Sequence, residues 1–255
     1  MLMRSTTRTL KVSTYKNPGF LKRYEQKLKA RQRICFRQIM KMLKPLKGKK
    51  ILDVGCGPGN LAKEMADLRA SIVAVDQSEK WIRICKKRHE ESRNLKFLTA
   101  DGGRLSFIQS KSVDAVVLNL VLPNVNSLNE VKRIFKEVGR VLKKGGIFIF
   151  SDLHPICVMT PKISPDRYQK YSRDFSYFKD GSVFVAGVVL NKDGKKKIEF
   201  KNRHWKLETY SRLLEQAGLY IYKLSEPTYS KRDPVLLRRY RIPEYLLFGC
   251  KKFSR

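Results

Sequence analysis

The chain has 255 residues and 42% hydrophobic content, which is enough for one large domain around a buried core and argues against extended disorder. Its formal net charge of +32 indicates either a polyanionic partner or a host whose proteins are generally basic. The longest apolar runs, at 112–121 and 146–150, are too short to cross a bilayer, so the sequence predicts no transmembrane helix.

The cysteines argue against both a disulfide framework and a zinc site. They are odd in number, widely spaced and without a C-x-x-C pair, at Cys35, Cys56, Cys85, Cys157 and Cys250. Histidine and acidic residues are also few and scattered, so we expect no metal site. This usage is typical of a reducing compartment, and we predict a cytoplasmic protein.

The first 47 residues are expected to form a basic region ahead of the main domain. Residues 1–50 contain 16 lysine and arginine residues against a single acid, Glu25. Residues 1–17 lack acids and are rich in Arg, Ser and Thr, a composition shared by mitochondrial transit segments and basic disordered arms, and we favour the arm. Apolar residues at helical spacing within 20–44 then predict a basic amphipathic helix that ends near Pro45.

From residue 48 onward, short apolar runs alternate with helical stretches, which is typical of βαβ units and a parallel sheet. A helix is expected after each of the first two strands, from Asn60 and from Ser78, and the spacing of Ser127 and Glu130 predicts a capping box at the start of a third. The first five expected strands are 51–54, 71–75, 95–99, 113–119 and 146–150.

The rhythm breaks at residues 152–205, which we interpret as an inserted cap within the domain 48–255. A hairpin of 183–190 with 196–200 is expected there, across Asp193-Gly194. A helix at 207–217 that ends at Gly218 and strands at 219–224 and 245–250 complete the chain. The predicted fold class is therefore α/β: a Rossmann-like, seven-stranded, mostly parallel sheet with helices on both faces and a cap after the fifth strand.

Chemistry is concentrated in the glycine-rich turn that follows the first strand. Its glycines fall in a G-x-G-x-G pattern, and Asn60 occupies the position where a dinucleotide fingerprint requires its third glycine. No lysine follows with P-loop spacing, so a nucleoside ligand without pyrophosphate fits better. Asp76, after the second strand, is placed to accept hydrogen bonds from ribose hydroxyls, and Asp101-Gly102, after the third, to face an exocyclic amine.

These motifs resemble class I S-adenosylmethionine-dependent methyltransferases of the ubiquinone and menaquinone biosynthesis type, over roughly residues 48–151. The resemblance implies S-adenosylmethionine as the cofactor, with the turn holding its methionine part, the second acid its ribose and the third its adenine. The segments 114–122 and 140–146 resemble the fourth and fifth motifs of the family. The expected cofactor-binding residues are Asp53, Gly55, Cys56, Gly57, Gly59, Asp76, Gln77, Asp101, Gly102, Asn119 and Leu120. Taken singly, each has a structural alternative as a tight turn, a buried carboxylate or a helix cap.

Methyl transfer depends mainly on aligning the acceptor with the methyl group, and a base helps only when the acceptor carries a proton. His154 and His204 follow the fifth strand and the hairpin, so we predict them as catalytic bases or orienting residues, with turn and stacking roles as the alternatives. Aromatic residues of the cap are expected either to wall the acceptor pocket or to pack the insertion: Tyr168, Tyr171, Tyr177 and Phe178.

The predicted function is methylation of a small molecule at oxygen, nitrogen or carbon. Asn119-Leu120-Val121-Leu122 stands where exocyclic-amine methylases carry an Asn/Asp-Pro-Pro-aromatic segment, and no Pro-Cys pair serves pyrimidine methylation. One alternative is an RNA methyltransferase that binds nucleic acid through the basic N-terminal region and the basic residues of 231–252. Another is peripheral contact of the helix at 20–44 with an anionic membrane. The oligomeric state is left open.

Overall fold

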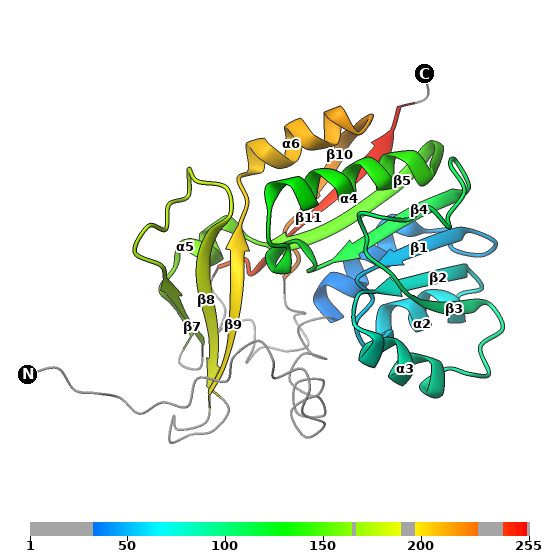
Figure 1. Ribbon diagram of the computed structural model, residues 1–255, viewed down its shortest axis with the longest axis horizontal. Coiled ribbons are helices and arrows are strands. Elements are labelled where there is room, and N and C mark those ends of the chain that lie inside the picture. Colours follow the sequence, from blue (N-terminus) through cyan, green and yellow to red (C-terminus); the bar gives the residue numbers. More distant parts are fainter. Residues whose placement is uncertain (1–32, 165–166, 190–196, 229–241, 254–255) are drawn as a thin grey trace, which may run out of the picture.

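A computed structural model describes residues 33–164, 167–189, 197–228 and 242–253 (Figure 1). A seven-stranded sheet has the order β10-β11-β5-β4-β1-β2-β3, in which β11 is antiparallel to both neighbours and the other pairs are parallel. Its strands are β1 (Lys50–Val54), β2 (Ser71–Asp76), β3 (Leu95–Thr99), β4 (Val113–Asn119), β5 (Leu142–Leu153), β10 (Leu219–Ser225) and β11 (Tyr245–Lys252).

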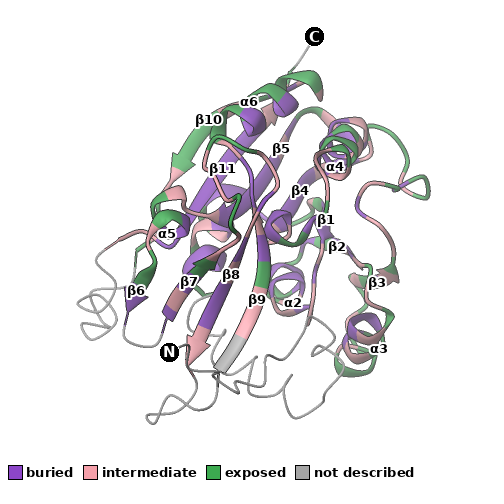
Figure 2. Cartoon of the chain, turned by 60° about the vertical axis from the view of Figure 1, so that its left-hand side comes forward, coloured by how far each residue is buried: buried purple, intermediate pink, exposed green. Residues whose placement is uncertain are grey.

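Helices cover both faces of this sheet, which confirms the predicted fold class. On one face, α4 (Leu128–Val141) and α6 (Leu207–Gln216) pack in a core cluster that includes Phe135, Phe148 and Tyr210 (Figure 1). On the other face, α2 (Asn60–Asp67), α3 (Glu79–Arg88) and the helical residues 33–43 pack in a second cluster. The central strand β4 is fully buried from Ala115 to Leu118 (Figure 2), as expected for a parallel strand covered on both sides.

Serine side chains cap both α3, which was expected to start at Ser78, and α4, for which a capping box was predicted. The Ser78 Oγ accepts a hydrogen bond from the Trp81 backbone N–H at 3.3 Å, and the Ser127 Oγ accepts one from Glu130 N–H at 3.3 Å. Such caps satisfy backbone donors that a first helical turn leaves without partners. The two caps therefore fix where α3 and α4 begin beside the carboxyl edge of the sheet.

The helical residues 33–43 belong to the core of the sheet domain, although they precede the boundary predicted at residue 47. Cys35, Phe36, Ile39 and Leu43 are buried there in the cluster that contains β1 and α2. Because this apolar face is covered by protein, it is not available to a membrane surface. The rest of the expected amphipathic helix, residues 20–32, lies outside the described residues.

The insertion at 152–205 forms a second, antiparallel sheet of order β6-β7-β8-β9, preceded by α5 (Pro155–Met159). The predicted hairpin is confirmed as the antiparallel pair β8–β9, whereas its turn at Asp193-Gly194 lies outside the described residues. The strands are β6 (Lys162–Ser164), β7 (Arg167–Tyr171), β8 (Ser182–Val189) and β9 (Lys197–His204).

The insertion is attached to the main sheet beside the end of β4. Strand β9 contacts the short helix η2 (Leu122–Asn124), which follows β4, and the Trp205 indole N–H donates to the Leu122 carbonyl at 2.9 Å. A buried ion pair between Arg167 and Glu244 joins β7 to the residue before β11. No helix among the described residues is both long and apolar enough to span a bilayer.

Candidate functional site

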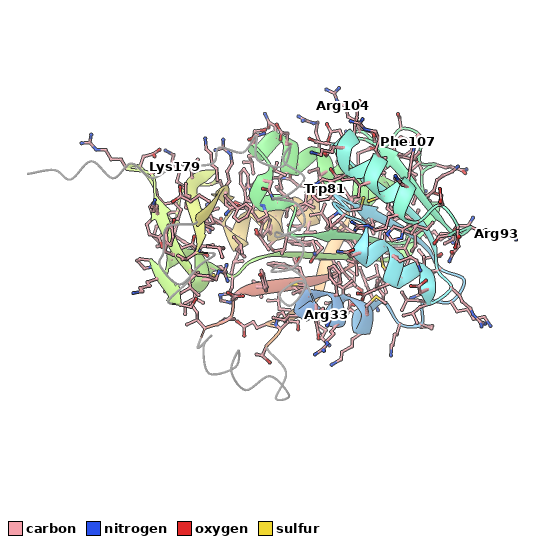
Figure 3. All side chains as sticks on the ribbon, turned by 90° about the horizontal axis from the view of Figure 1, so that it is seen from below. Arg33, Trp81, Arg93, Arg104, Phe107 and Lys179 are labelled. Carbon is pink, nitrogen blue, oxygen red and sulfur yellow. The ribbon has the colours of Figure 1, made fainter. Side chains whose placement is uncertain are left out.

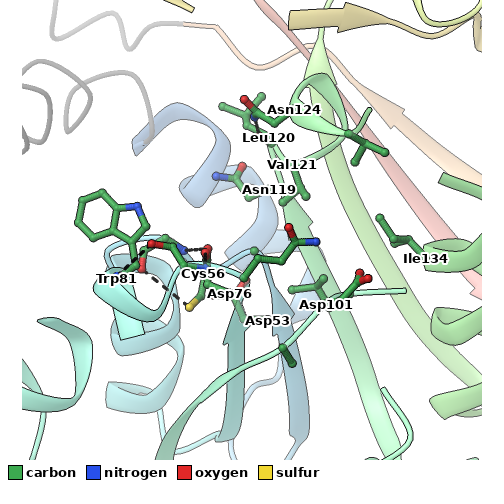
Figure 4. Close-up of a pocket in the computed structure, with 18 of the residues that line it drawn as sticks. Asp53, Cys56, Asp76, Trp81, Asp101, Asn119, Leu120, Val121, Asn124 and Ile134 are labelled. Atoms are coloured by element: carbon green, nitrogen blue, oxygen red, sulfur yellow. Dashed lines mark hydrogen bonds between the residues drawn. The ribbon is translucent and has the colours of Figure 1, made fainter. Parts of the chain in front are cut away.

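A cavity of about 430 Å³ opens where β1, β2 and β4 end at the carboxyl edge of the sheet (Figure 4). Its volume lies in the range of small-molecule sites, and in open α/β sheets ligands bind at this edge. The parallel topology thus brings together residues that are far apart in the chain.

The glycine-rich turn after β1 forms the floor of the cavity. Gly55 has φ +72°, and a Cβ at this position would lie 2.4 Å from Cγ2 of Val121 on the facing wall. A Cβ on Gly57, with φ +51°, would have no heavy atom within 4 Å, so the backbone there is open to a ligand. Side chains rarely adopt this left-handed conformation, which explains why both positions carry glycine.

Gly59 has a different role from the one predicted. It is the N-cap of α2 with φ +76°, and a Cβ there would lie 2.9 Å from the Phe97 ring. It does not line the cavity. Its glycine is explained by the close packing of the turn against β3 and α3.

Asp76 closes the cavity on the β2 side. Its Oδ2 accepts a hydrogen bond from Gly57 N–H at 2.8 Å, and its Oδ1 accepts one from Ser78 N–H at 2.9 Å. Burial raises the pKa of this carboxyl, and the two backbone hydrogen bonds oppose that shift. Each oxygen keeps further acceptor capacity, so the carboxylate can bind a ligand hydroxyl while it holds the glycine turn in place.

Asp53, the last residue but one of β1, is a buried acid without a complete set of partners. It is 2% exposed, and its Oδ2 has no hydrogen-bond partner among the described residues. Burial, with a smaller contribution from the nearby Asp76, raises the pKa of Asp53 to about 7. A buried acceptor of this kind is costly unless a donor or a cation reaches it.

The charge of the cavity is opposite to that of the protein. Four acids line it, Asp53, Asp76, Asp101 and Glu130, and no lysine, arginine or histidine is among the described lining residues. Basic side chains such as Arg93, Arg104 and Lys179 instead extend outward at the periphery (Figure 3). The cavity therefore favours a cationic ligand and disfavours pyrophosphates.

All the predicted cofactor residues except Gly59 line this cavity. Sequence reasoning missed several others, among them Phe36, Trp81, Asn124, Asn126 and Ile134. Trp81 could have been found, because it lies in the first turn of the helix that Asp76 precedes. Phe36 could not, because its position shows only helical apolar spacing.

The two predicted histidines lie outside the cavity lining. His154 Nδ1 accepts a hydrogen bond from Ile156 N–H at 3.1 Å, so the proton resides on Nε2, which donates to Glu226 Oε1 at 2.8 Å. His204 is buried, its Nε2 lies 3.0 Å from the Tyr177 carbonyl oxygen, and burial lowers its pKa. Both rings are thus engaged in local structure, and we assign neither a catalytic role.

The aromatic residues of the insertion also lie outside the cavity lining. The Tyr168 hydroxyl donates a hydrogen bond to Glu199, and the Tyr171 hydroxyl donates one to the Val158 carbonyl. The Tyr177 ring packs against the His204 ring, with 4.8 Å between the ring centroids. Phe178 is 83% exposed. Three of these side chains therefore pack the insertion, which was the alternative to a pocket wall.

Comparison with known proteins identifies the segment that forms the cavity. Residues 52–150 match the model of a family described as "Methyltransferase domain". The chain is 35% identical over 111 residues to the ubiquinone biosynthesis O-methyltransferase of Pelagibacter ubique, and the aligned region covers 44% of this chain and 45% of that protein. It is 23% identical over 192 residues to the putative methyltransferase YqeM of Bacillus subtilis, covering 71% and 77%. The chain thus spans less than half the length of the first of these relatives.

Solved structures agree on the fold. A putative S-adenosylmethionine-dependent methyltransferase from Listeria monocytogenes superimposes with a TM-score of 0.66 at 21% identity, covering 88% of this chain and 98% of that one. A second, from Mesorhizobium loti, gives a TM-score of 0.64 at 23% identity, covering 86% and 96%.

Proposed function

We propose that the chain is a class I S-adenosylmethionine-dependent methyltransferase that methylates a small-molecule acceptor at the cavity described above, and the match of residues 52–150 to a methyltransferase family supports this. The observation that carries the proposal is the acidic lining, formed at the carboxyl ends of β1 and β2, just after β3 and in the first turn of α4. S-adenosylmethionine, the cofactor of this family, has a sulfonium and an ammonium group against one carboxylate, so its net charge suits such a lining.

The cavity residues fit that cofactor chemically. Asp76 offers a two-oxygen acceptor for ribose hydroxyls, and the Oδ2 of Asp53 offers an anionic partner for a positive group. Gly57 leaves open space where a side chain would otherwise stand. Leu120, Val121 and Ile134 add apolar walls for the adenosyl group.

When bound, the cofactor supplies a methyl group attached to a positively charged sulfonium, and the rest of the cofactor leaves as a neutral thioether. The contribution of the chain is to bind the cofactor, to orient it and to exclude water from the methyl group. The carboxylates stabilise the positive charge of the bound cofactor before the reaction, which favours binding but does not lower the barrier to transfer. The rate enhancement therefore depends on how well the acceptor is aligned with the methyl group.

The acceptor is proposed to be a small molecule without an anionic group near the methyl-accepting atom, because the lining residues that the structure describes include no cation to pair with one. The name of the Pelagibacter relative supports oxygen as the first acceptor atom to test. The RNA alternative depends on the basic residues of 1–50 and of 231–252, of which residues 1–32 and 231–241 lie outside the described residues.

Incubation with methyl-labelled S-adenosylmethionine tests the acceptor class. The purified protein is supplied in parallel with a small-molecule extract and with total RNA from the same cells. We expect label in the small-molecule fraction and in no RNA, and a chain with Asp76→Ala serves as the negative control. Label confined to RNA would reject the small-molecule proposal and favour the alternative.

Cofactor affinity is expected to rise with pH between about 5.5 and 7.5. The pKa of Asp53 is about 7 in the free protein, so below that value the carboxyl is largely protonated and cannot pair with a cation. Binding of a cation lowers this pKa, so one proton is released on binding, and affinity falls by up to about tenfold per pH unit below pH 7. Calorimetric titrations across this window measure the effect.

Asp53→Asn is the control for this pH dependence. It keeps the shape of the side chain but cannot ionise, so it should bind weakly and with a flatter pH profile. An equally steep profile in Asp53→Asn would show that another group titrates. The same pKa shift implies that Asp53 costs the free protein stability as the pH rises from about 4 to 7, and a bound cation offsets this cost.

A further inference from the structure

A buried serine on β5 connects two cavity residues at the end of β4. Ser151 is fully buried and is paired with Asn119 in the parallel ladder between the two strands. Its Oγ donates a hydrogen bond to Asn119 Oδ1 at 2.7 Å and accepts one from Leu120 N–H at 3.1 Å. Burial raises the pKa of the nearby Cys35 thiol on the helical segment 33–43, and its contact with Ser151 only partly opposes this rise, so the thiol stays protonated. Ser151 itself does not line the cavity.

The bond from Ser151 fixes which end of the Asn119 carboxamide is available to a ligand. A serine hydroxyl has one proton to donate, and here it is given to the amide oxygen of Asn119. The two N–H donors of the Asn119 amide are then left for the cavity that this residue lines (Figure 4). Without the hydroxyl, the carboxamide could rotate and present either end.

The same serine holds a strained residue in place. Leu120 has φ +56°, a left-handed conformation that costs a residue with a side chain about 1–2 kcal/mol. Its N–H donates to both the Oγ and the main-chain oxygen of Ser151, at 3.1 and 3.2 Å. Leu120 and the following Val121 form the wall that faces Gly55, and the bond from Leu120 N–H to the main-chain oxygen of Ser151 holds this wall even without the hydroxyl.

We propose that Ser151 is a positioning residue for the cofactor: it turns the Asn119 amide so that its N–H groups bind the carboxylate of the amino-acid part. This inference rests on the proposed function. A ligand carboxylate needs donors, and the described lining offers no lysine, arginine or histidine to supply them. A neutral amide held in one orientation meets that need without adding positive charge beside the sulfonium.

Two ligands and four variants test the proposal by calorimetry. The ligands are S-adenosylhomocysteine, which has the amino-acid part, and 5′-methylthioadenosine, which shares the adenosyl thioether but lacks that part. The variants are Ser151→Ala, Asn119→Ala, their combination, and Ser182→Ala as the control. Ser182 is also a buried serine whose Oγ accepts a backbone hydrogen bond, but it lies in the insertion.

We expect Ser151→Ala and Asn119→Ala each to weaken S-adenosylhomocysteine binding by about tenfold, the effect of one hydrogen bond to a charged group. The double variant should bind no more weakly than Asn119→Ala alone, because Ser151 acts through Asn119. Affinity for 5′-methylthioadenosine should be unchanged in all variants, and Ser182→Ala should match the wild-type chain with both ligands.

Three results would overturn the proposal: equal loss of affinity for both ligands, additive losses in the double variant, or an unchanged affinity in Ser151→Ala. Melting temperatures of the free variants separate a change in affinity from partial unfolding. If the wild-type chain binds neither ligand, the proposed function itself fails. If the wild-type chain binds both and Ser151→Ala behaves like it, only the role of Ser151 fails.

Discussion

Replacing Asp76 by alanine should weaken S-adenosylmethionine binding on the order of 100-fold or more. The variant removes the two-oxygen acceptor proposed for the ribose, and each hydrogen bond to a charged group contributes about 1.5–3 kcal/mol. The variant also removes the acceptors of two backbone hydrogen bonds, which the Gly57 and Ser78 N–H groups donate to the Asp76 carboxylate at 2.8 and 2.9 Å in the wild-type chain. Calorimetric titration near pH 7.5 measures the loss.

Asp67→Ala is the matched control, because it removes an acid of the same type at the end of α2. The Asp67 side chain is 59% exposed and pairs with Lys63 across the helix surface. Pairs of this kind contribute little to stability, so the control should bind the cofactor as the wild-type chain does. Equal affinities of Asp76→Ala and the wild-type chain would remove Asp76 from the site.

Gly55→Ala is expected to abolish measurable cofactor binding and to lower the melting temperature. The added Cβ would lie 2.4 Å from Cγ2 of Val121, and φ +72° is unfavourable for alanine. Strain of about 1–2 kcal/mol is then added to overpacking of about 1–3 kcal/mol. Relief of the clash displaces the wall formed by Leu120 and Val121, which narrows or distorts the cavity.

Two further variants separate strain from the clash. Gly145→Ala has the same left-handed conformation, φ +69°, but a Cβ there has no heavy atom within 4 Å, so it should lose stability from strain alone and keep cofactor affinity. The double variant Gly55→Ala/Val121→Ala removes the clashing methyl groups and should regain part of the lost affinity. No recovery, or an equal loss in Gly145→Ala, would show that the clash is not the cause.

Much of the sheet could be predicted from the sequence because its strands are short apolar runs between polar breaks. The bounds expected for β3 and β4 agree with the structure. Strand β5 begins at Leu142 rather than at the predicted Gly146, because Leu142 pairs with Val113. The residues Lys143-Lys144-Gly145 between them are not apolar, so the sequence does not indicate a strand there. The earlier start of β5 follows from pairing with β4.

The candidate site was predictable to the extent that topology determines it. The carboxyl ends of parallel strands meet at one edge, so Asp53, Asp76, Asp101 and Asn119 converge without further information. The contributions of Phe36 and Ile134 depend on how helices pack across the sheet, and no local pattern records that packing. His154 and His204 were chosen from chain position alone, which does not show which groups engage their ring nitrogens.

The hydrogen bond from Ser151 to Asn119 illustrates the same limit. The two residues are separated by 32 positions, and their pairing follows from the register between β4 and β5. A buried serine within an apolar strand is visible in the sequence, but the partner that it orients is not.

The acidic cavity is expected to bind a cationic adenosyl ligand, and every role assigned to the residues around it depends on this binding. Calorimetric titration of the folded protein with S-adenosylmethionine, beside ATP as an anionic adenosine compound, tests this claim directly. We expect saturable heat with S-adenosylmethionine and none with ATP, since the described lining has no cation for a triphosphate. No heat with S-adenosylmethionine, or tighter binding of ATP, would contradict the account.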